Sequence, residues 1–412
     1  MSRSAILCVL ILSFARPEFL SAQMSDRSYT LEEVLTIAEA RNPSVALFQA
    51  NFESARGGLR SAQSYPNPEW ETSLGKGKAL EADARYESEY SLGISQILEW
   101  PGKRLYRKKA AEAELAVAGE DLQDFRLELI SQVKEAFFGV LFSERIAQVL
   151  AENERTAEEM VRSTQMRVES GEASALELIK AQVEFLRITK DRRRSESHVI
   201  LAKATLNAVL GGALKEGYRV KGEFARSDKR YDLAALIESA QGRHPLIQRQ
   251  RKAVEAADDA LSRERQARVP DLILRGSVTE EIDKRSFAIG LAIPFPLFYQ
   301  RQGEISQAQG RRAQAVAELE RARLNLTKRI TEAYQEYRMA QAQLELLEQG
   351  LLRAADEALK IARLSYAEGE SDLLNLLDSQ RAQRSVVVEY QQAQFELQVA
   401  LARLERAAGG LP

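Results

Sequence analysis

Apolar residues recur along the second half of the chain in alternating steps of four and three. One series runs over 326–361 and another over 386–404. The first comprises Leu326, Ile330, Ala333, Tyr337, Ala340, Leu344, Leu347, Leu351, Ala354, Ala358 and Ile361. This spacing keeps side chains on one face of a helix that packs against another helix. It predicts a long helix over about 301–367, a reversal at Gly369, and a returning helix over about 371–408.

Two segments in each half of the chain alternate with a period of two. Tyr90, Leu92 and Ile94 fall on one face of the segment 86–97, and the residues between them are small or polar. A period of two is that of a β-strand with two different faces. The pattern predicts strands over about 69–75, 86–97, 271–281 and 287–293.

The same plan of elements is written twice. Four pairs of residues recur in the same order, namely Tyr29 and Tyr231, Pro43 and Pro245, Gly93 and Gly290, and Gly171 and Gly369. Four anchors in one order indicate duplication of a unit of about 200 residues. We therefore expect a first repeat over 23–228 and a second over 229–412. Helices are expected over about 31–41, 44–63, 103–167 and 172–210, and over about 233–243, 246–267, 301–367 and 371–408.

The lengths of these helices predict how each repeat is arranged. At about 1.5 Å per residue, the helix over 103–167 is about 98 Å long. The returning helix covers only about 60 Å, and the helix before the strands about 30 Å. Stacked end to end, the two shorter helices nearly match the long one. Each repeat is expected to form two rods, with the strands at one end and the glycine reversal at the other.

The predicted strands are too few to cross a membrane alone. The smallest single-chain membrane barrels have about eight strands, and an open sheet edge cannot face lipid. After the N-terminal segment, no apolar run reaches the length of a spanning helix. If the chain crosses a membrane, strands from several copies are expected to do so together.

The first 22 residues have the pattern of a signal peptide. Arg3 precedes a short apolar core over 5–15, and small residues at Ser21 and Ala22 offer a cleavage site. The core is about half the roughly 20 residues that a spanning helix needs. Cys8, the only cysteine, lies inside this core, too early for a lipid-anchoring position. We expect an exported chain that loses residues 1–22 and has no lipid anchor or disulfide.

Composition narrows the possible functions. The chain has 412 residues, of which 45% are hydrophobic, so it can form a sizeable core. Its net charge of −2 gives no basic footprint for nucleic acid. The only histidines are His198 and His244, and without mature cysteines a Cys/His metal site is excluded. His244 stands before a proline at a helix end, and no catalytic constellation is present. We expect neither an enzyme nor a cofactor.

Several local motifs strengthen the picture of a duplicated helical protein with strands. Tyr-Pro-Asn-Pro over 65–68 opens the first strand, and 95–104, ending Trp-Pro-Gly-Lys-Arg, joins strand to long helix. Gly171 and Gly369 lead into leucine-rich helices. From about residue 29 to 408, the chain resembles the TolC family of outer-membrane efflux proteins. The stretch 96–104, ending Gly-Lys-Arg, is similar to the CzcC-like heavy-metal efflux branch of that family.

The resemblance implies a mostly α-helical fold with a small membrane β-barrel. It implies a homotrimer, with four strands per chain in a twelve-stranded barrel within outer-membrane lipid, above an α-helical tunnel in the periplasm. A periplasmic adaptor protein would connect it to an inner-membrane pump of the RND type. The turns at Gly171, Glu172, Gly369 and Glu370 would dock the adaptor. Family aspartates that narrow the tip correspond to Asn375 and Asp378, so the first ring would be neutral here.

Four other functions remain open from the sequence. The chain could form the duct of a drug-efflux system or of a type I protein secretion system. It could instead be a periplasmic coiled-coil scaffold without a pore, or an enzyme in a helical fold. The strands count against the scaffold, because one apolar face and one small or polar face suit lipid outside and water inside. A heavy-metal efflux duct in the outer membrane is the preferred hypothesis.

Overall fold

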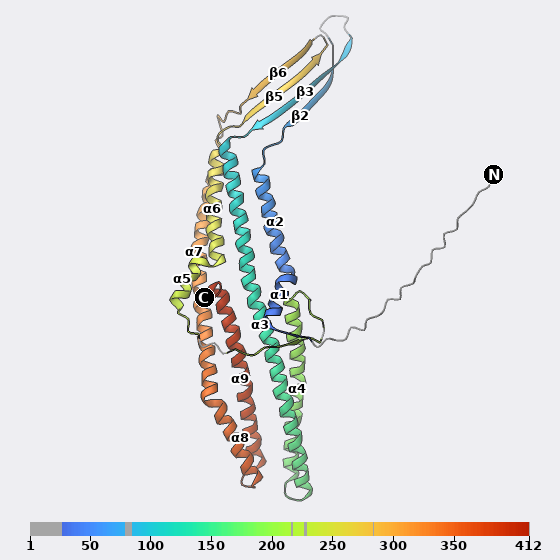
Figure 1. Ribbon diagram of the computed structural model, residues 1–412, viewed down its shortest axis with the longest axis vertical. Helices are drawn as coiled ribbons and strands as arrows, with labels where there is room; N and C mark the ends of the chain where they lie inside the picture. The colour runs from blue at the N-terminus through green and yellow to red at the C-terminus, as the bar shows by residue number, and fades with distance from the viewer. Residues whose placement is uncertain (1–26, 79–84, 216, 226–228, 283, 412) are drawn as a thin grey trace, which may run out of the picture.

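A computed structural model describes residues 27–78, 85–215, 217–225, 229–282 and 284–411. The expected signal peptide and Cys8 lie outside the described residues. The described chain is elongated, with a β-sheet at one end, helices along its length, and two helical turns at the other end (Figure 1). Within this part of the chain, no helix is both long and apolar enough to span a membrane.

The first half begins with two helices that meet at a proline. Its elements are α1 (Leu31–Arg41), α2 (Pro43–Gln63), β2 (Glu69–Lys78), β3 (Tyr86–Leu98), α3 (Pro101–Glu169) and α4 (Ala175–Val209). Thr30 and Glu33 form a capping box at the start of α1. Asn42 ends α1 and caps α2, where the Asn-Pro pair stops one helix and starts the next.

The second half shows the same order of elements. They are α5 (Leu233–Arg243), α6 (Pro245–Gln266), β5 (Leu272–Glu281), β6 (Lys284–Ala292), α7 (Gln302–Leu346), a π-helical turn η1 (Leu347–Leu351), α8 (Leu352–Ala367) and α9 (Leu373–Ala408). His244 takes the place of Asn42, since it ends α5 and caps α6. The segment expected as one helix over 301–367 is therefore divided by η1.

One antiparallel sheet joins the two halves. Its strand order is β2-β3-β5-β6, and β3 pairs with β5 with Ile94 opposite Gly276. A second, parallel pair joins β1 (Ser28–Tyr29) to β4 (Arg219–Val220). The alternation pattern did not reveal this pair, because two-residue strands are too short to show a period.

The long helix α3 forms the spine of the first half. It has 69 residues and is about 104 Å long. The shorter helices α2, with 21 residues, and α4, with 35, lie one after the other along it (Figure 1). In the second half, α6 and α9 lie in the same way along α7 and α8. Each half has its own hydrophobic core where its helices meet near the middle of the molecule.

The apolar seam of α7 follows the predicted positions only as far as Leu347. From Leu326 to Leu347 all seven seam positions are buried, but Leu351, Ala354, Ala358 and Ile361 are exposed. The prediction for these four residues was wrong. Below η1 the inward positions are Leu352, Ala355, Leu359 and Ala362, each one residue later.

The π turn explains this shift. The amide of Leu352 donates to the carbonyl of Leu347, five residues back, so a step of five replaces a step of four. One residue more separates Gly290 from Gly369 than separates their counterparts Gly93 and Gly171. The turn therefore accommodates a single extra residue while the seam stays on the face that packs against α9.

Candidate functional site

The two turns at the end opposite the sheet have the same backbone conformation. Gly171 (φ +79°) and Gly369 (φ +78°) both lie in the left-handed region. The amide of Glu172 donates to the carbonyl of Arg167 at 2.8 Å, and that of Glu370 donates to Ser365 at 2.9 Å. These bonds form the Schellman arrangement, which satisfies carbonyls at a helix end. A Cβ on either glycine would meet nothing within 4 Å, so backbone conformation alone favours glycine here.

Side-chain caps restart the helices after each turn. Ser174 and Glu177 form a capping box at the start of α4. Asp372 accepts the amide of Asn375 at 3.0 Å at the start of α9. The turns are thus short, fixed connections whose exposed residues include Glu172 and Glu370.

The two turns are held side by side. Ala181, Leu373 and Leu377 form a small buried cluster between α4 and α9, with Met160, Val161 and Tyr366 packed against it. The guanidinium of Arg167, in the last turn of α3, lies 5.0 Å from the centre of the Tyr366 ring in α8. Residues far apart in the sequence therefore form one end surface, which carries all of Gly171, Glu172, Gly369 and Glu370.

A buried carboxylate links α4 to α9 near this end. Glu184 is only 3% exposed. Its Oε2 accepts from Nε and Nη2 of Arg381 at 3.0 and 2.7 Å, and its Oε1 accepts from Nη2 of Arg384 at 3.1 Å. Sequence reasoning missed this cluster, because the arginines lie 197 and 200 positions away. A single Glu among many charged helix residues gives no local signal.

The surroundings of Glu184 determine its protonation. Burial pushes the pKa of this carboxyl up, but hydrogen bonds from Arg381 and Arg384 and their positive charges outweigh burial, so the pKa is lowered overall. Glu184 therefore stays ionised at neutral pH and binds α9 as a charge-assisted pair.

The predicted constriction residues lie on one exposed face of α9. Asn375 and Asp378 are both exposed and stand about one helical turn apart. The Asp378 carboxylate is 60% exposed and accepts from Nη1 of Arg381 at 3.0 Å. Arg381 thus joins Asp378 to the buried Glu184, and its charge offsets part of the charge of Asp378.

His244 is buried and acts as a helix cap. It is 2% exposed, and its Nδ1 accepts the amide of Leu246 at 3.1 Å. Burial lowers the pKa of His244, which favours the neutral ring that this cap requires. Across the described residues, no group of three or more His, Cys, Asp or Glu side chains could hold a metal ion.

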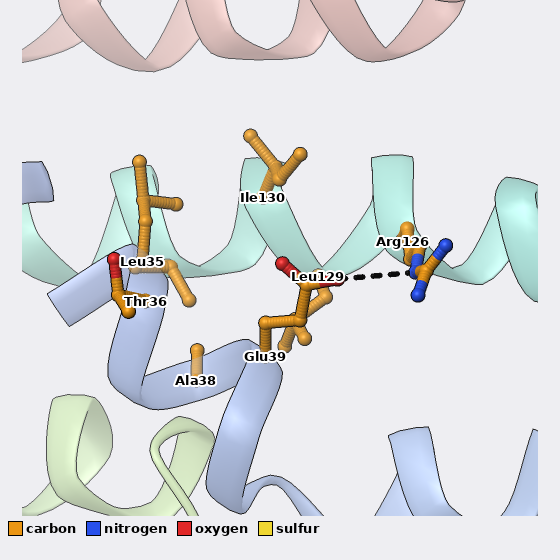
Figure 2. A pocket seen from close by; sticks show the side chains of 8 residues that line it. Leu35, Thr36, Ala38, Glu39, Arg126, Leu129 and Ile130 are labelled. Carbon is orange, nitrogen blue, oxygen red and sulfur yellow. Dashed lines mark ion pairs between the residues drawn. The ribbon is translucent and has the colours of Figure 1, made fainter. Parts of the chain in front are cut away.

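A hollow of about 240 Å³ lies between α1 and α3, far from the turns. Figure 2 shows Leu35 and Ile130 at its wall and the ion pair between Glu39 and Arg126, at 3.3 Å. Its lining is mainly apolar, and its one ion pair is partly exposed. The hollow brings together no groups for catalysis or metal binding.

Comparison with known proteins decides the family. The sequence profile of the outer membrane efflux protein family matches residues 34–212 and 236–410, most of both halves. The chain belongs to this family. It is 26% identical over 355 residues to the cobalt-zinc-cadmium resistance protein CzcC of Cupriavidus metallidurans, covering 85% of this chain and 83% of that protein.

Solved channels of the same fold agree with the family. The outer-membrane channel OprN aligns with a TM-score of 0.80 at 19% identity, covering 92% of this chain and 90% of that one. CusC aligns with a TM-score of 0.80 at 18% identity, covering 92% of each chain. The mostly helical fold and the TolC-family resemblance are confirmed.

This outer membrane efflux protein is therefore a subunit of an outer-membrane channel in a tripartite efflux system, with a long helical portion in the periplasm. The turns at Gly171 and Gly369 lie at the end of the rods away from the sheet.

Loss of the buried carboxylate should destabilise this end of the molecule. In Glu184→Ala, Arg381 and Arg384 lose this partner but stay partly exposed, and we expect the free energy of unfolding to fall by about 1.5–3 kcal/mol. Denaturant unfolding in detergent, followed by circular dichroism, measures this. The control is Glu158→Ala, whose exposed pair with Arg162 should contribute about 0–1 kcal/mol.

The stabilisation that ionised Glu184 provides depends on pH. Because the folded pKa of Glu184 is lowered, its contribution is present above the unfolded pKa of about 4.3 and is lost as pH falls through the folded pKa. The difference between wild type and Glu184→Gln should be full at neutral pH and shrink in acid below about pH 4. A difference that stays constant down to strongly acid pH would contradict this account of the cluster.

Proposed function

We propose that this protein is a homotrimeric, passive exit duct for divalent heavy-metal cations, with no catalytic step of its own. An inner-membrane pump of the RND type would deliver the cations through a periplasmic adaptor. The observation that carries the substrate class is the similarity to a cobalt-zinc-cadmium resistance protein along 85% of the chain. The stretch 96–104, which ends Gly-Lys-Arg and is similar to the heavy-metal branch, supports it.

The sheet supports assembly with further copies in a membrane. By the strand register, one face carries Trp70, Leu74, Ile94, Ile289 and Leu291, all exposed. The other face carries small or polar residues, including Ser73, Ser91, Gly93, Ser277 and Gly290. One apolar and one polar face suit lipid outside and water inside.

The outer edges of this sheet require partners in such a setting. Within the described residues, β2 and β6 each pair on one side only. An unpaired edge in lipid costs several kcal/mol per unsatisfied group. We propose that β2 of one copy pairs with β6 of the next, so that three copies form a closed barrel of twelve strands.

The adaptor contact is proposed at the two turns of each copy. Gly171 with Glu172 and Gly369 with Glu370 present two copies of one backbone shape on one end surface. A repeated, rigid and exposed shape suits docking by a repeated partner, because little entropy is lost on binding. Glu172 and Glu370 add negative charge, which would favour basic residues on the adaptor.

The constriction is proposed at Asn375 and Asp378. In a trimer, three Asp378 carboxylates near one axis would concentrate cations. The three Asn375 side chains would form a neutral ring one turn away. Arg381 lies beside each Asp378, and its positive charge weakens the attraction of the three carboxylates for cations. A weaker attraction suits a duct that must release its cations outward.

The substrate class is tested by deleting the gene from its host. Growth should become more sensitive to cobalt, zinc and cadmium salts and stay unchanged with antibiotics, because the duct would serve a metal pump. Inhibitory concentrations on a panel of salts and antibiotics measure this, with complementation by the wild-type gene as control. Sensitivity to antibiotics alone would favour a drug-efflux duct instead.

The docking surface is tested by changing backbone freedom at the turns. Gly171→Val and Gly369→Val place a β-branched residue at positive φ, which costs about 1–2 kcal/mol and should distort the turn. Adaptor capture in a pull-down should fall, while outer-membrane insertion is retained. Gly171→Asn and Gly369→Asn are the matched controls, since Asn tolerates this conformation. Normal capture by both valine variants would mean that the turns only reverse the chain.

The constriction is tested by adding and removing charge. Asp378→Asn should reduce the preference of the channel for cations, and Asn375→Asp should increase block by divalent cations, because it adds a second acidic ring. Single-channel recordings in planar bilayers with added Co²⁺ or Zn²⁺ measure both. The proposal fails if neither variant changes the current, since both residues would then lie away from the permeation path.

A further inference from the structure

Charges separate onto opposite faces at the hairpin end of the sheet, the end farthest from the helices (Figure 1). The strand register places Lys76 and Lys78 of β2 and Arg285 of β6 on the apolar face. The polar face at the same level carries mainly acidic residues, namely Glu87, Glu89 and Glu281, beside Lys284. Positive charge therefore prevails on the apolar face of this end, and negative charge on the polar face.

The two lysines on the apolar face have uncharged neighbours across the strand pair. Lys76 and Lys78 are both exposed. The residues opposite them on the same face are Ser88 and Tyr86. The carboxylate of Glu89, from the neighbouring strand, lies over the other face of β2. The positive charge of the two ammonium groups is therefore open to a ligand that approaches the apolar face.

Arg285 has hydrogen-bond donors to spare. Its side chain is 74% exposed, and its Nε lies 3.8 Å from Oε2 of Glu280. The same carboxylate also accepts a hydrogen bond from the hydroxyl of Tyr90. A guanidinium has five N–H donors, so a loose contact with one shared carboxylate leaves most of them for another anion.

These basic residues lie at the level of the outer headgroups when the sheet is in the outer membrane. The helical portion lies in the periplasm, so the hairpin end of the sheet faces outward (Figure 1). Trp70, near the other end of β2, is 70% exposed on the same apolar face. From Trp70 to Lys78 the strand runs about 26 Å. An apolar membrane band is about 25 Å tall with aromatic residues at both borders, which here are Trp70 and Tyr86.

We propose that Lys76, Lys78 and Arg285 bind the phosphate groups of lipids in the outer leaflet of the outer membrane. Phosphate carries the complementary charge and accepts hydrogen bonds from both ammonium and guanidinium groups. The exposed residues Leu74 and Phe287, one row further in on the same face, would contact the acyl chains of such a lipid. Basic and apolar groups side by side fit an anionic lipid better than a free anion.

Closure of the barrel would gather these charges. β2 and β6 are the outer strands of the described sheet, and β2 of one copy is proposed above to pair with β6 of the next. Lys76 and Lys78 would then lie on the strand next to the one that carries Arg285 of the neighbouring copy. The lipid site rests on the proposed membrane position of the sheet and adds a ligand to the proposed function.

Lipid binding is tested with lipid A, a glycolipid that carries two phosphates. Native mass spectrometry of the detergent-solubilised protein should show retained lipid A, less of the monophosphorylated form, and little of a form without phosphates. The triple variant Lys76→Gln/Lys78→Gln/Arg285→Gln should raise the lipid A concentration at half-saturation tenfold or more. Added salt should also weaken binding by the wild type, because the basic groups are exposed.

Two adjacent residues provide a matched pair of variants. Arg285 and Lys284 are neighbours in β6 but lie on opposite faces of the sheet. Arg285→Gln and Lys284→Gln each remove one positive charge at the same level, and only the first should weaken lipid A binding. Both side chains are exposed, so circular dichroism should show an unchanged fold in both variants.

The outcomes separate the lipid site from the proposed function. A triple variant that binds lipid A like the wild type overturns the site, and so does equal binding of the form without phosphates. Displacement of lipid A by an equal concentration of inorganic phosphate also overturns it, since the acyl chains would then contribute nothing. These results leave the proposed duct standing, because metal sensitivity and oligomeric state are measured separately. A wild type that is monomeric by light scattering contradicts the trimer, whereas phosphate-dependent binding that Lys76→Gln/Lys78→Gln abolishes still supports the site on β2.

Discussion

The apolar seam along each long helix is the constraint on which the rest of the structure depends. A shorter helix can lie along α3 or along α7–α8 only while seam residues stay on one face. In the first half, α3 is one unbroken α-helix of 69 residues. In the second half one extra residue would rotate everything below it by about 100°. The π turn at Leu347–Leu351 takes up that residue, so Leu359 faces inward and Ile361 faces out.

This constraint positions the end of the molecule that carries the two glycine turns. Because α4 lies along α3 and α9 lies along α7–α8, the turns at Gly171 and Gly369 end side by side with the same backbone bonds. Their alignment lets Arg381 and Arg384 reach Glu184, and it places Asp378 on the outer face of α9 beside Arg381. If α8 were rotated by one residue, the turn at Gly369 would move away from the end of α3. Arg167 would then no longer lie against Tyr366.

Duplication of the unit leaves the two halves of the chain with different neighbours. In the first half, β3 and α3 are contacted by β5, α6 and α9 of the second half. Their counterparts β6 and α7–α8 do not make the equivalent contacts with the first half in the described chain. The contact between the halves contains the ion cluster that Glu184 forms with Arg381 and Arg384.

The sequence by itself determined most of the elements and their approximate ends, but not the β1–β4 pair or η1. Strands and helices were predicted from apolar periods of two and 3.5 residues, and helix ends from the Asn-Pro and His-Pro pairs and the turn glycines. Each of these signals acts within a few residues, so local chemistry suffices to place the elements. The sequence also showed the family through motifs such as 95–104. Only the tertiary structure decided which face of α8 turns inward, that Glu184 is paired, and that Asp378 shares an arginine with it. These outcomes depend on residues brought together across about two hundred positions, and no local pattern records them.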